Sequence, residues 1–174
     1  PDVPEPGMPR DSQPVEQTAV ADLAHFAVGW ALLHEIRHLK HQQEGTAAPF
    51  DGERQKRHED ELSCDKYATQ FFLSQVGAFA QAEGVEERLV CMKRGIGIYF
   101  ALFSLTLISK ENTWKESDTH PAESRIRAVR RIMGHDGRNG VLAEAIGYAA
   151  FAALRFLWPD APCPFESGIA SESN

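Results

Sequence analysis

The chain has 174 residues, about the size of one domain that buries most of its apolar surface without disulfide or metal staples. Hydrophobic residues make up 43% and charged residues 25%, as in soluble globular proteins, and the net charge of −7 argues against a nucleic-acid-binding surface. The three cysteines, Cys64, Cys91 and Cys163, form no C-x-x-C pair. This excludes a disulfide framework or a cysteine-rich zinc site, and reduced thiols in the cytoplasm are the simplest interpretation.

Both ends of the chain have the composition of loose segments. Residues 1–14 are rich in proline and are predicted to form a disordered arm or linker, and residues 159–174 are predicted to form a loose tail. Because the chain begins with Pro1 and not with Met, we expect it to be a domain of a longer protein. The most apolar run, 95–108, is too short to cross a bilayer, so no membrane segment is expected.

Between these ends, five segments have the pattern of helices, and no segment alternates convincingly as a strand does. The predicted helices cover residues 15–43, 54–81, 86–109, 119–133 and 141–158. Glycine and proline clusters separate them. We therefore predict a mainly α domain over residues 15–158, a bundle of about five helices with minimal β-structure.

The first predicted helix contains the sequence His34-Glu35-Ile36-Arg37-His38, which has the pattern H-E-x-x-H. Positions four apart lie nearly above one another on an α-helix, so His34 and His38 are placed to offer two imidazoles to one metal ion. Glu35 lies beside that face, where its carboxylate reaches a metal-bound water more readily than it serves as a ligand. The alternative interpretation is two ordinary helix histidines beside a solvated glutamate.

The apolar positions of the same helix lead into these histidines. They form one predicted stripe: Val20, Leu23, Ala27 and Ala31. Continued by steps of three and four residues, this stripe reaches His34, His38 and His41, which are therefore predicted to face the core. Buried polar groups need partners, and this favours a ligand role for the histidines.

A catalytic zinc site takes a third protein ligand, and three residues are candidates for it. Glu44 is weak, because the glycine that bends the chain in H-E-x-x-H-x-x-G-x-x-H is missing. His58 lies one turn before Glu61 on the second predicted helix. Glu61 is favoured, because Asp65 follows on the same face and is placed to accept the spare imidazole N–H of His34. Two acids on an otherwise apolar face require a positive partner, which a zinc ion supplies.

Three motifs occur in a characteristic order: H-E-I-R-H at 34–38, E-L-S-C-D-K-Y-A at 61–68 and T-H-P at 119–121. Together they resemble the gluzincin metallopeptidases. The chain is most similar to the branch that includes HtpX and the CAAX prenyl proteases, to the soluble minigluzincins and to the Lit-type phage-exclusion peptidases. These families pair H-E-x-x-H with a downstream E-x-x-x-D and a later H-P that an arginine follows. The resemblance spans residues 30–130, and the missing membrane helices of the HtpX branch favour the soluble relatives.

This resemblance implies a zincin-like bundle in which the H-E-x-x-H helix packs on the E-x-x-x-D helix. It implies Zn²⁺ as the cofactor, with three protein ligands: His34, His38 and Glu61. It also implies that Glu35 is the catalytic base and that Asp65 supports a ligand histidine.

The third motif implies that His120 and a following arginine also lie near the active site. Arg125, which precedes the apolar Ile126, is favoured over Arg127 for this role. At the start of a helix, His120 is placed to donate a hydrogen bond to the oxyanion of a reacting carbonyl. The alternative interpretation of His120 and Pro121 is a helix-start signal alone.

The predicted function is a zinc-dependent endopeptidase that acts on a protein or peptide substrate, with Glu35 as the general base. One alternative is a catalytically silent interaction or regulatory module that zinc stabilises. A di-iron bundle is excluded, because it requires a second E-x-x-H pair and the sequence contains only the one that ends at His38.

Overall fold

The computed structural model describes residues 15–49, 54–108, 122–133, 145 and 149. These residues form helices, without a strand among them, which confirms the predicted mainly α fold. The helices are α1 (Val15–Glu44), α2 (Arg54–Ser74), α3 (Val76–Glu83), α4 (Glu87–Ile108) and α5 (Ala122–Met133). The predicted arm over 1–14, the tail over 159–174 and nearly all of the predicted helix over 141–158 lie outside the described residues.

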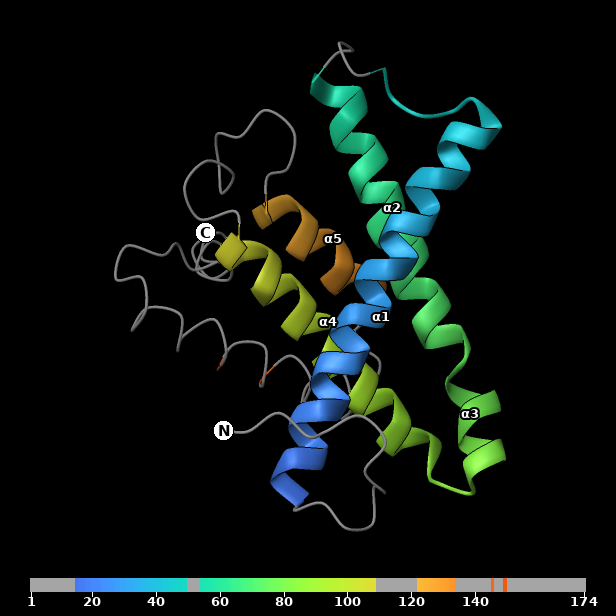
Figure 1. The fold of residues 1–174 in the computed structure, drawn as a ribbon, viewed down its shortest axis with the longest axis vertical. Helices are drawn as coiled ribbons and strands as arrows, with labels where there is room; N and C mark the ends of the chain where they lie inside the picture. Colours follow the sequence, from blue (N-terminus) through green and yellow to red (C-terminus); the bar gives the residue numbers. More distant parts are fainter. Residues whose placement is uncertain (1–14, 50–53, 109–121, 134–144, 146–148, 150–174) are drawn as a thin grey trace, which may run out of the picture.

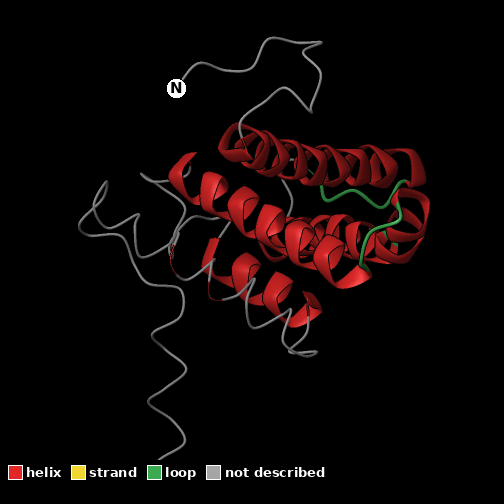
Figure 2. Cartoon of the chain, turned by 90° about the horizontal axis from the view of Figure 1, so that it is seen from below, coloured by secondary structure: helices red, strands yellow, loops and turns green. Residues whose placement is uncertain are grey.

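The long helix α1 organises the bundle, because it packs against both α2 and α4 (Figure 1). The H-E-x-x-H helix therefore lies on the E-x-x-x-D helix, as predicted. α5 packs against α2 from another side, and α3 packs against α4. Figure 2 shows the same arrangement of helices seen from below. Residues on α1, α2 and α5 are thereby brought to one region of the bundle.

The core lies where four of the helices meet. Its fully buried members include Trp30, Ala68, Ile98, Leu102 and Ile126. Burying a large apolar side chain stabilises the fold by about 1.5–3 kcal/mol. The absence of a side chain at Gly97 lets α1 and α4 approach closely, since a Cβ at Gly97 would collide with the Cβ of Phe26. This tight packing fixes α1, which carries the histidines.

The buried face of α1 differs from the predicted stripe at two positions. Val20 and Ala31 are exposed, and Trp30, only 3% exposed, is buried instead. The indole N–H of Trp30 donates a hydrogen bond to Thr69 Oγ1 on α2 at 3.0 Å. The prediction was wrong there because steps of three and four residues both suit a helix, and only the neighbouring helices decide which side is covered.

The single helix predicted over 54–81 is in fact two helices, α2 and α3, separated by Gln75 at φ −90° and ψ 3°. Arg94 of α4 donates a hydrogen bond to the Phe72 carbonyl. In a continuous helix that carbonyl would accept the N–H of Val76. The guanidinium therefore supplies a partner for the end of α2. Beyond the break, α3 packs on α4 through an apolar cluster: Val76, Ala80 and Val90.

Candidate metal centre

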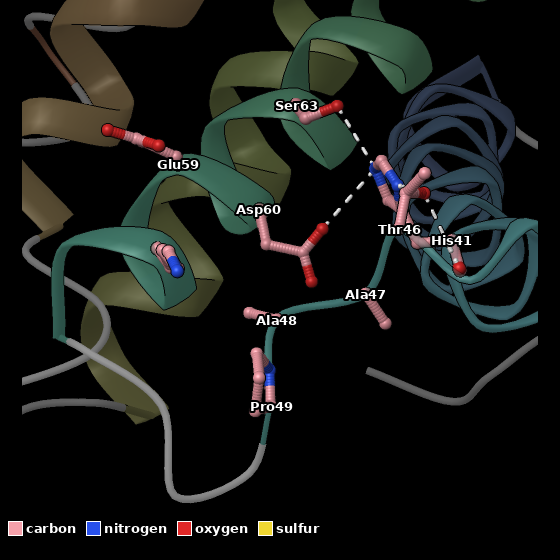
Figure 3. A pocket seen from close by; sticks show the side chains of 9 residues that line it. His41, Thr46, Ala47, Ala48, Pro49, Glu59, Asp60 and Ser63 are labelled. Atoms are coloured by element: carbon pink, nitrogen blue, oxygen red, sulfur yellow. Dashed lines mark hydrogen bonds and ion pairs between the residues drawn. The ribbon is translucent and has the colours of Figure 1, made fainter.

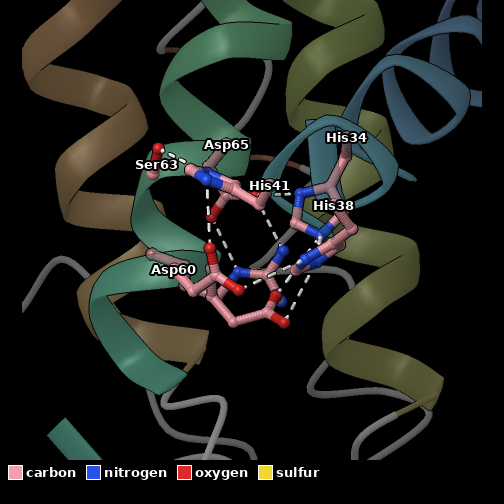
Figure 4. Close-up of polar contacts among 8 residues, drawn as sticks. His34, His38, His41, Asp60, Ser63 and Asp65 are labelled. Carbon is pink, nitrogen blue, oxygen red and sulfur yellow. Dashed lines mark hydrogen bonds and ion pairs between the residues drawn. The ribbon is translucent and has the colours of Figure 1, made fainter. Parts of the chain in front are cut away.

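The contact between α1 and α2 brings His34, His38 and Glu61 together. Figure 4 shows the two histidines of α1 beside the part of α2 that carries Asp60 and Asp65. His34 Nε2 lies 3.0 Å from His38 Nε2. The Glu61 carboxylate reaches both rings, with Oε2 at 3.3 Å from His34 Nε2 and Oε1 at 3.3 Å from His38 Nε2. Two imidazole nitrogens and one carboxylate thus converge on a single point between the helices.

The spacing of these three side chains fits a tetrahedral zinc ion. Donor atoms bound to zinc at about 2.1 Å lie about 3.4 Å apart when the geometry is tetrahedral. The donor atoms of His34, His38 and Glu61 are 3.0–3.3 Å apart, close to that value. Two histidines and one glutamate are also a donor set that catalytic zinc sites use. The residues present therefore fit the metal that the sequence predicted.

The orientation of His34 is set by Asp65, whose Oδ1 lies 2.9 Å from His34 Nδ1. Asp65 is fully buried at 0% exposure, so its carboxylate is held in one place. An imidazole that donates its Nδ1–H to a carboxylate keeps the lone pair on Nε2 for a metal ion. The structure thus makes the contact between His34 and Asp65 that the sequence predicted.

Asp65 is in turn clamped by Arg125 of α5, which is 3% exposed. Arg125 Nε and Nη2 donate to the two Asp65 oxygens, each at 2.7 Å, and Arg125 Nη1 lies 3.2 Å from Glu61 Oε2. Burial alone would raise the pKa of Asp65, but the bonds from Arg125 and His34 outweigh it and hold the pKa below its usual value. Of the two arginines considered from the sequence, Arg125 therefore makes the contacts with the acids. His120 lies outside the described residues.

The acids around the two histidines also change the basicity of the rings. Burial lowers the pKa of His34, but hydrogen bonds to Asp65 and Glu61 overcome this and raise it to about 9. Hydrogen bonds to Cys64 and Glu61 raise the pKa of His38 to about 10. Negative surroundings that favour a proton on these nitrogens favour a metal cation in its place, and the two compete.

The other side of His38 holds a group that the sequence analysis missed. Asp60 Oδ2 lies 3.7 Å from His38 Nδ1, and Asp60 Oδ1 lies 3.3 Å from His41 Nε2. His38, Asp60 and Cys64 form a second set of side chains whose donor atoms lie within 4.8 Å of one another. The signal was present in the sequence, because Asp60 and Cys64 have the same spacing of four residues as Glu61 and Asp65.

The remaining candidates from the sequence lie elsewhere or point differently. His58 Nε2 faces Ser124 Oγ of α5 at 3.1 Å, and Glu44 is exposed and pairs with Arg37 at 3.3 Å. Neither is part of the group formed by the two motif histidines. Glu35 is exposed on α1, directly after His34.

Comparison with known protein families assigns the chain. The family model described as peptidase U49 matches residues 1–146, which is most of the sequence. The chain belongs to the peptidase U49 family. Neither a curated protein nor a solved structure is significantly similar to it. Membership of the U49 family makes the chain a peptidase with a protein or peptide substrate.

A pocket of about 370 Å³ opens beside the candidate centre of this U49 peptidase, between the end of α1 and the start of α2 (Figure 3). It is lined by nine residues: His41, Thr46, Ala47, Ala48, Pro49, Lys56, Glu59, Asp60 and Ser63. His41 is held there by Thr46 Oγ1 at 2.8 Å from Nδ1 and Ser63 Oγ at 3.1 Å from Nε2. None of the described helices is both long enough and apolar enough to span a membrane.

Proposed function

We propose that this U49 peptidase is a zinc-dependent endopeptidase of the gluzincin type. One observation carries the proposal: His34 Nε2, His38 Nε2 and the Glu61 carboxylate converge from two helices at distances that suit one zinc ion. Glu35 follows the first of these ligands directly and is exposed to solvent, where a substrate is able to reach it. The family match supports the peptidase activity, and the geometry supports its metal dependence.

When bound, zinc would supply Lewis acidity, which acidifies water and polarises the scissile carbonyl. The Glu35 carboxylate takes a proton from the attacking water as its oxygen adds to the carbonyl carbon. The same carboxyl then delivers that proton to the leaving nitrogen, so that the C–N bond breaks and an acid and an amine are released. In this proposal His120 donates a hydrogen bond to the oxyanion, a contribution worth roughly 3 kcal/mol in other enzymes.

Asp65 and Arg125 act in this proposal as positioning residues. Arg125 contacts Asp65 and Glu61, and Asp65 contacts His34, so both residues hold ligands in place. Their burial keeps these contacts out of competition with water. The role of Arg125 is thus to set the orientation of His34 and Glu61.

The proposal is tested with Glu35→Gln, which keeps the shape of the side chain and removes the base. Zinc content by mass spectrometry should equal that of the wild type, since Glu35 is not a ligand, while cleavage should fall by about 10²–10⁴-fold. Terminal-labelling proteomics on cells that express either form identifies the substrate. Glu44→Gln, at an exposed glutamate of the same helix, is the matched control and should cleave normally.

Two results would contradict the proposal. Undiminished cleavage by Glu35→Gln would show that another group is the base. Stoichiometric zinc without cleavage by either form would indicate the catalytically silent, zinc-stabilised interaction module instead.

A further inference from the structure

The imidazole of His38 faces a different set of donor atoms on each side. Its Nε2 points at His34 and Glu61, and its Nδ1 lies 3.7 Å from Asp60 Oδ2. A separation of 3.7 Å is too long for a hydrogen bond. It is close to the separation of about 3.4 Å expected for two donors of one tetrahedral ion. The Nδ1 side of the ring therefore has the spacing of a chelating pair.

Cys64 supplies a third donor near His38 and Asp60. Its side chain is fully buried at 0% exposure. The donor atoms of His38, Asp60 and Cys64 all lie within 4.8 Å of one another. A nitrogen, a carboxylate oxygen and a sulfur form a donor set that suits zinc and other thiophilic divalent cations.

Asp65 and Asp60 have different partners, and these partners determine whether a metal ion is able to bind the carboxylate. Both oxygens of Asp65 accept hydrogen bonds from Arg125 at 2.7 Å, so a guanidinium already occupies the place of a cation. The oxygens of Asp60 instead face the imidazoles of His38 and His41. An imidazole is able to lose its proton to an incoming metal ion, whereas a guanidinium is not.

The pocket between α1 and α2 provides access to this group, because Asp60 and His41 line it (Figure 3). The His41 ring is anchored by Thr46 and Ser63, and it holds Asp60 Oδ1 at 3.3 Å. Metal ligands are usually held by such outer contacts. A cation that enters the pocket therefore meets a carboxylate that is already oriented towards His38.

We propose that His38, Asp60 and Cys64 form a second site for a thiophilic divalent cation such as Zn²⁺, adjacent to the proposed catalytic centre. Binding releases one proton from the Cys64 thiol and one from His38 Nδ1 to solvent, so that His38 becomes an imidazolate when both ions are bound, and the carboxylate, the thiolate and the imidazolate offset the charge of the ions. The site itself does not require the first centre to be catalytic.

Cobalt titration of the full chain tests the proposal, because a cobalt–thiolate bond gives a charge-transfer band in the near ultraviolet. The wild type should bind two equivalents of Co²⁺, and the band should appear with the second. Cys64→Ala should bind one equivalent without the band. Cys91→Ala, at a partly buried cysteine of α4, is the matched control and should bind two equivalents with the band.

A wild type that shows no thiolate band at any cobalt concentration would overturn the proposal, as would a band that survives in Cys64→Ala. Circular dichroism shows whether Cys64→Ala folds. If it does not, Asp60→Asn is the second variant, and it should weaken the second equivalent by at least about ten-fold while the first is retained. A chain without peptidase activity would still show the band. The cobalt test therefore decides on the second site alone, and the Glu35→Gln test decides on the catalytic proposal alone.

Discussion

The two histidines of the H-E-x-x-H motif are supported by very different surroundings. The side chain of His34 is 8% exposed and contacts Asp65, which Arg125 holds with two hydrogen bonds of 2.7 Å. The side chain of His38 is 23% exposed and meets Asp60 at 3.7 Å. Both acids lie on α2, so the difference comes from α5, whose arginine closes one flank. In our proposals the acid that a guanidinium reaches, Asp65, supports a histidine, and the acid that it does not reach, Asp60, is a ligand for a second cation.

The largest expected effect comes from Arg125→Met, which removes the contacts of the guanidinium with Asp65 and Glu61. The substitution removes the guanidinium that pairs with the buried acids Asp65 and Glu61, so the free energy of unfolding should fall by about 3–5 kcal/mol. Urea denaturation measures the loss. Arg131→Met, at an exposed position of the same helix, is the control and should change stability by less than about 0.5 kcal/mol. A loss below about 1 kcal/mol for Arg125→Met would mean that this residue does not neutralise the buried acids.

A second prediction concerns pH in the metal-free protein. The pKa values of His34 and His38, about 9 and about 10, lie above the ordinary value of 6.5. Their protons therefore stabilise the fold fully below pH 6.5, and this stability is lost as the pH rises through 9 to 10. Because the two Nε2 atoms lie 3.0 Å apart, only one of the two rings carries an extra proton at a time, so the loss should be on the order of 3–5 kcal/mol, measured by thermal melts with a chelator present.

Zinc should reverse this trend, because metal binding requires both Nε2 atoms to be unprotonated. The zinc-bound protein should gain stability relative to the metal-free protein across the same pH range. His25→Gln, at an exposed histidine of α1, is the matched control and should leave the metal-free profile unchanged. A metal-free profile that is flat or rises with pH would contradict the role given to the acids.

The smallest expected effect compares the two flanks directly. Asp65→Asn should weaken the first zinc equivalent by about 10–100-fold, because His34 loses the carboxylate that orients it. Asp60→Asn should weaken that equivalent by less than about ten-fold, because at 3.7 Å the carboxylate makes no hydrogen bond to His38. Competition with a chromophoric chelator measures both. Equal losses of zinc affinity in the two variants would show that Asp65 and Asp60 support the metal alike.

Much of the candidate site was readable from the sequence because helical spacing is a local property. The spacing of four residues in H-E-x-x-H and E-x-x-x-D places each pair on one helix face. The expectation that buried acids need positive partners then led to Glu61 and Asp65. The same spacing between Asp60 and Cys64 went unnoticed, because no motif pointed to it. The role of His120 stays a prediction.

Other features depended on contacts between distant parts of the chain. Trp30, and not the predicted Ala31, lies in the core, because α2 covers that side of α1. The predicted helix over 54–81 is interrupted at Gln75, where Arg94 of α4 donates a hydrogen bond to the Phe72 carbonyl. Propensity and periodicity describe one helix at a time, so they do not predict where a neighbour will interrupt it.

The sequence by itself determined that this peptidase is mainly helical and that two histidines and two acids share helix faces. The tertiary structure decided that His34 contacts an acid paired with an arginine, whereas His38 lies beside Asp60 without a hydrogen bond to it. That choice rests on Arg125 meeting Asp65 across 60 residues of sequence. Helix periodicity acts over a few residues, whereas the pairing of a buried charge depends on how separate helices dock.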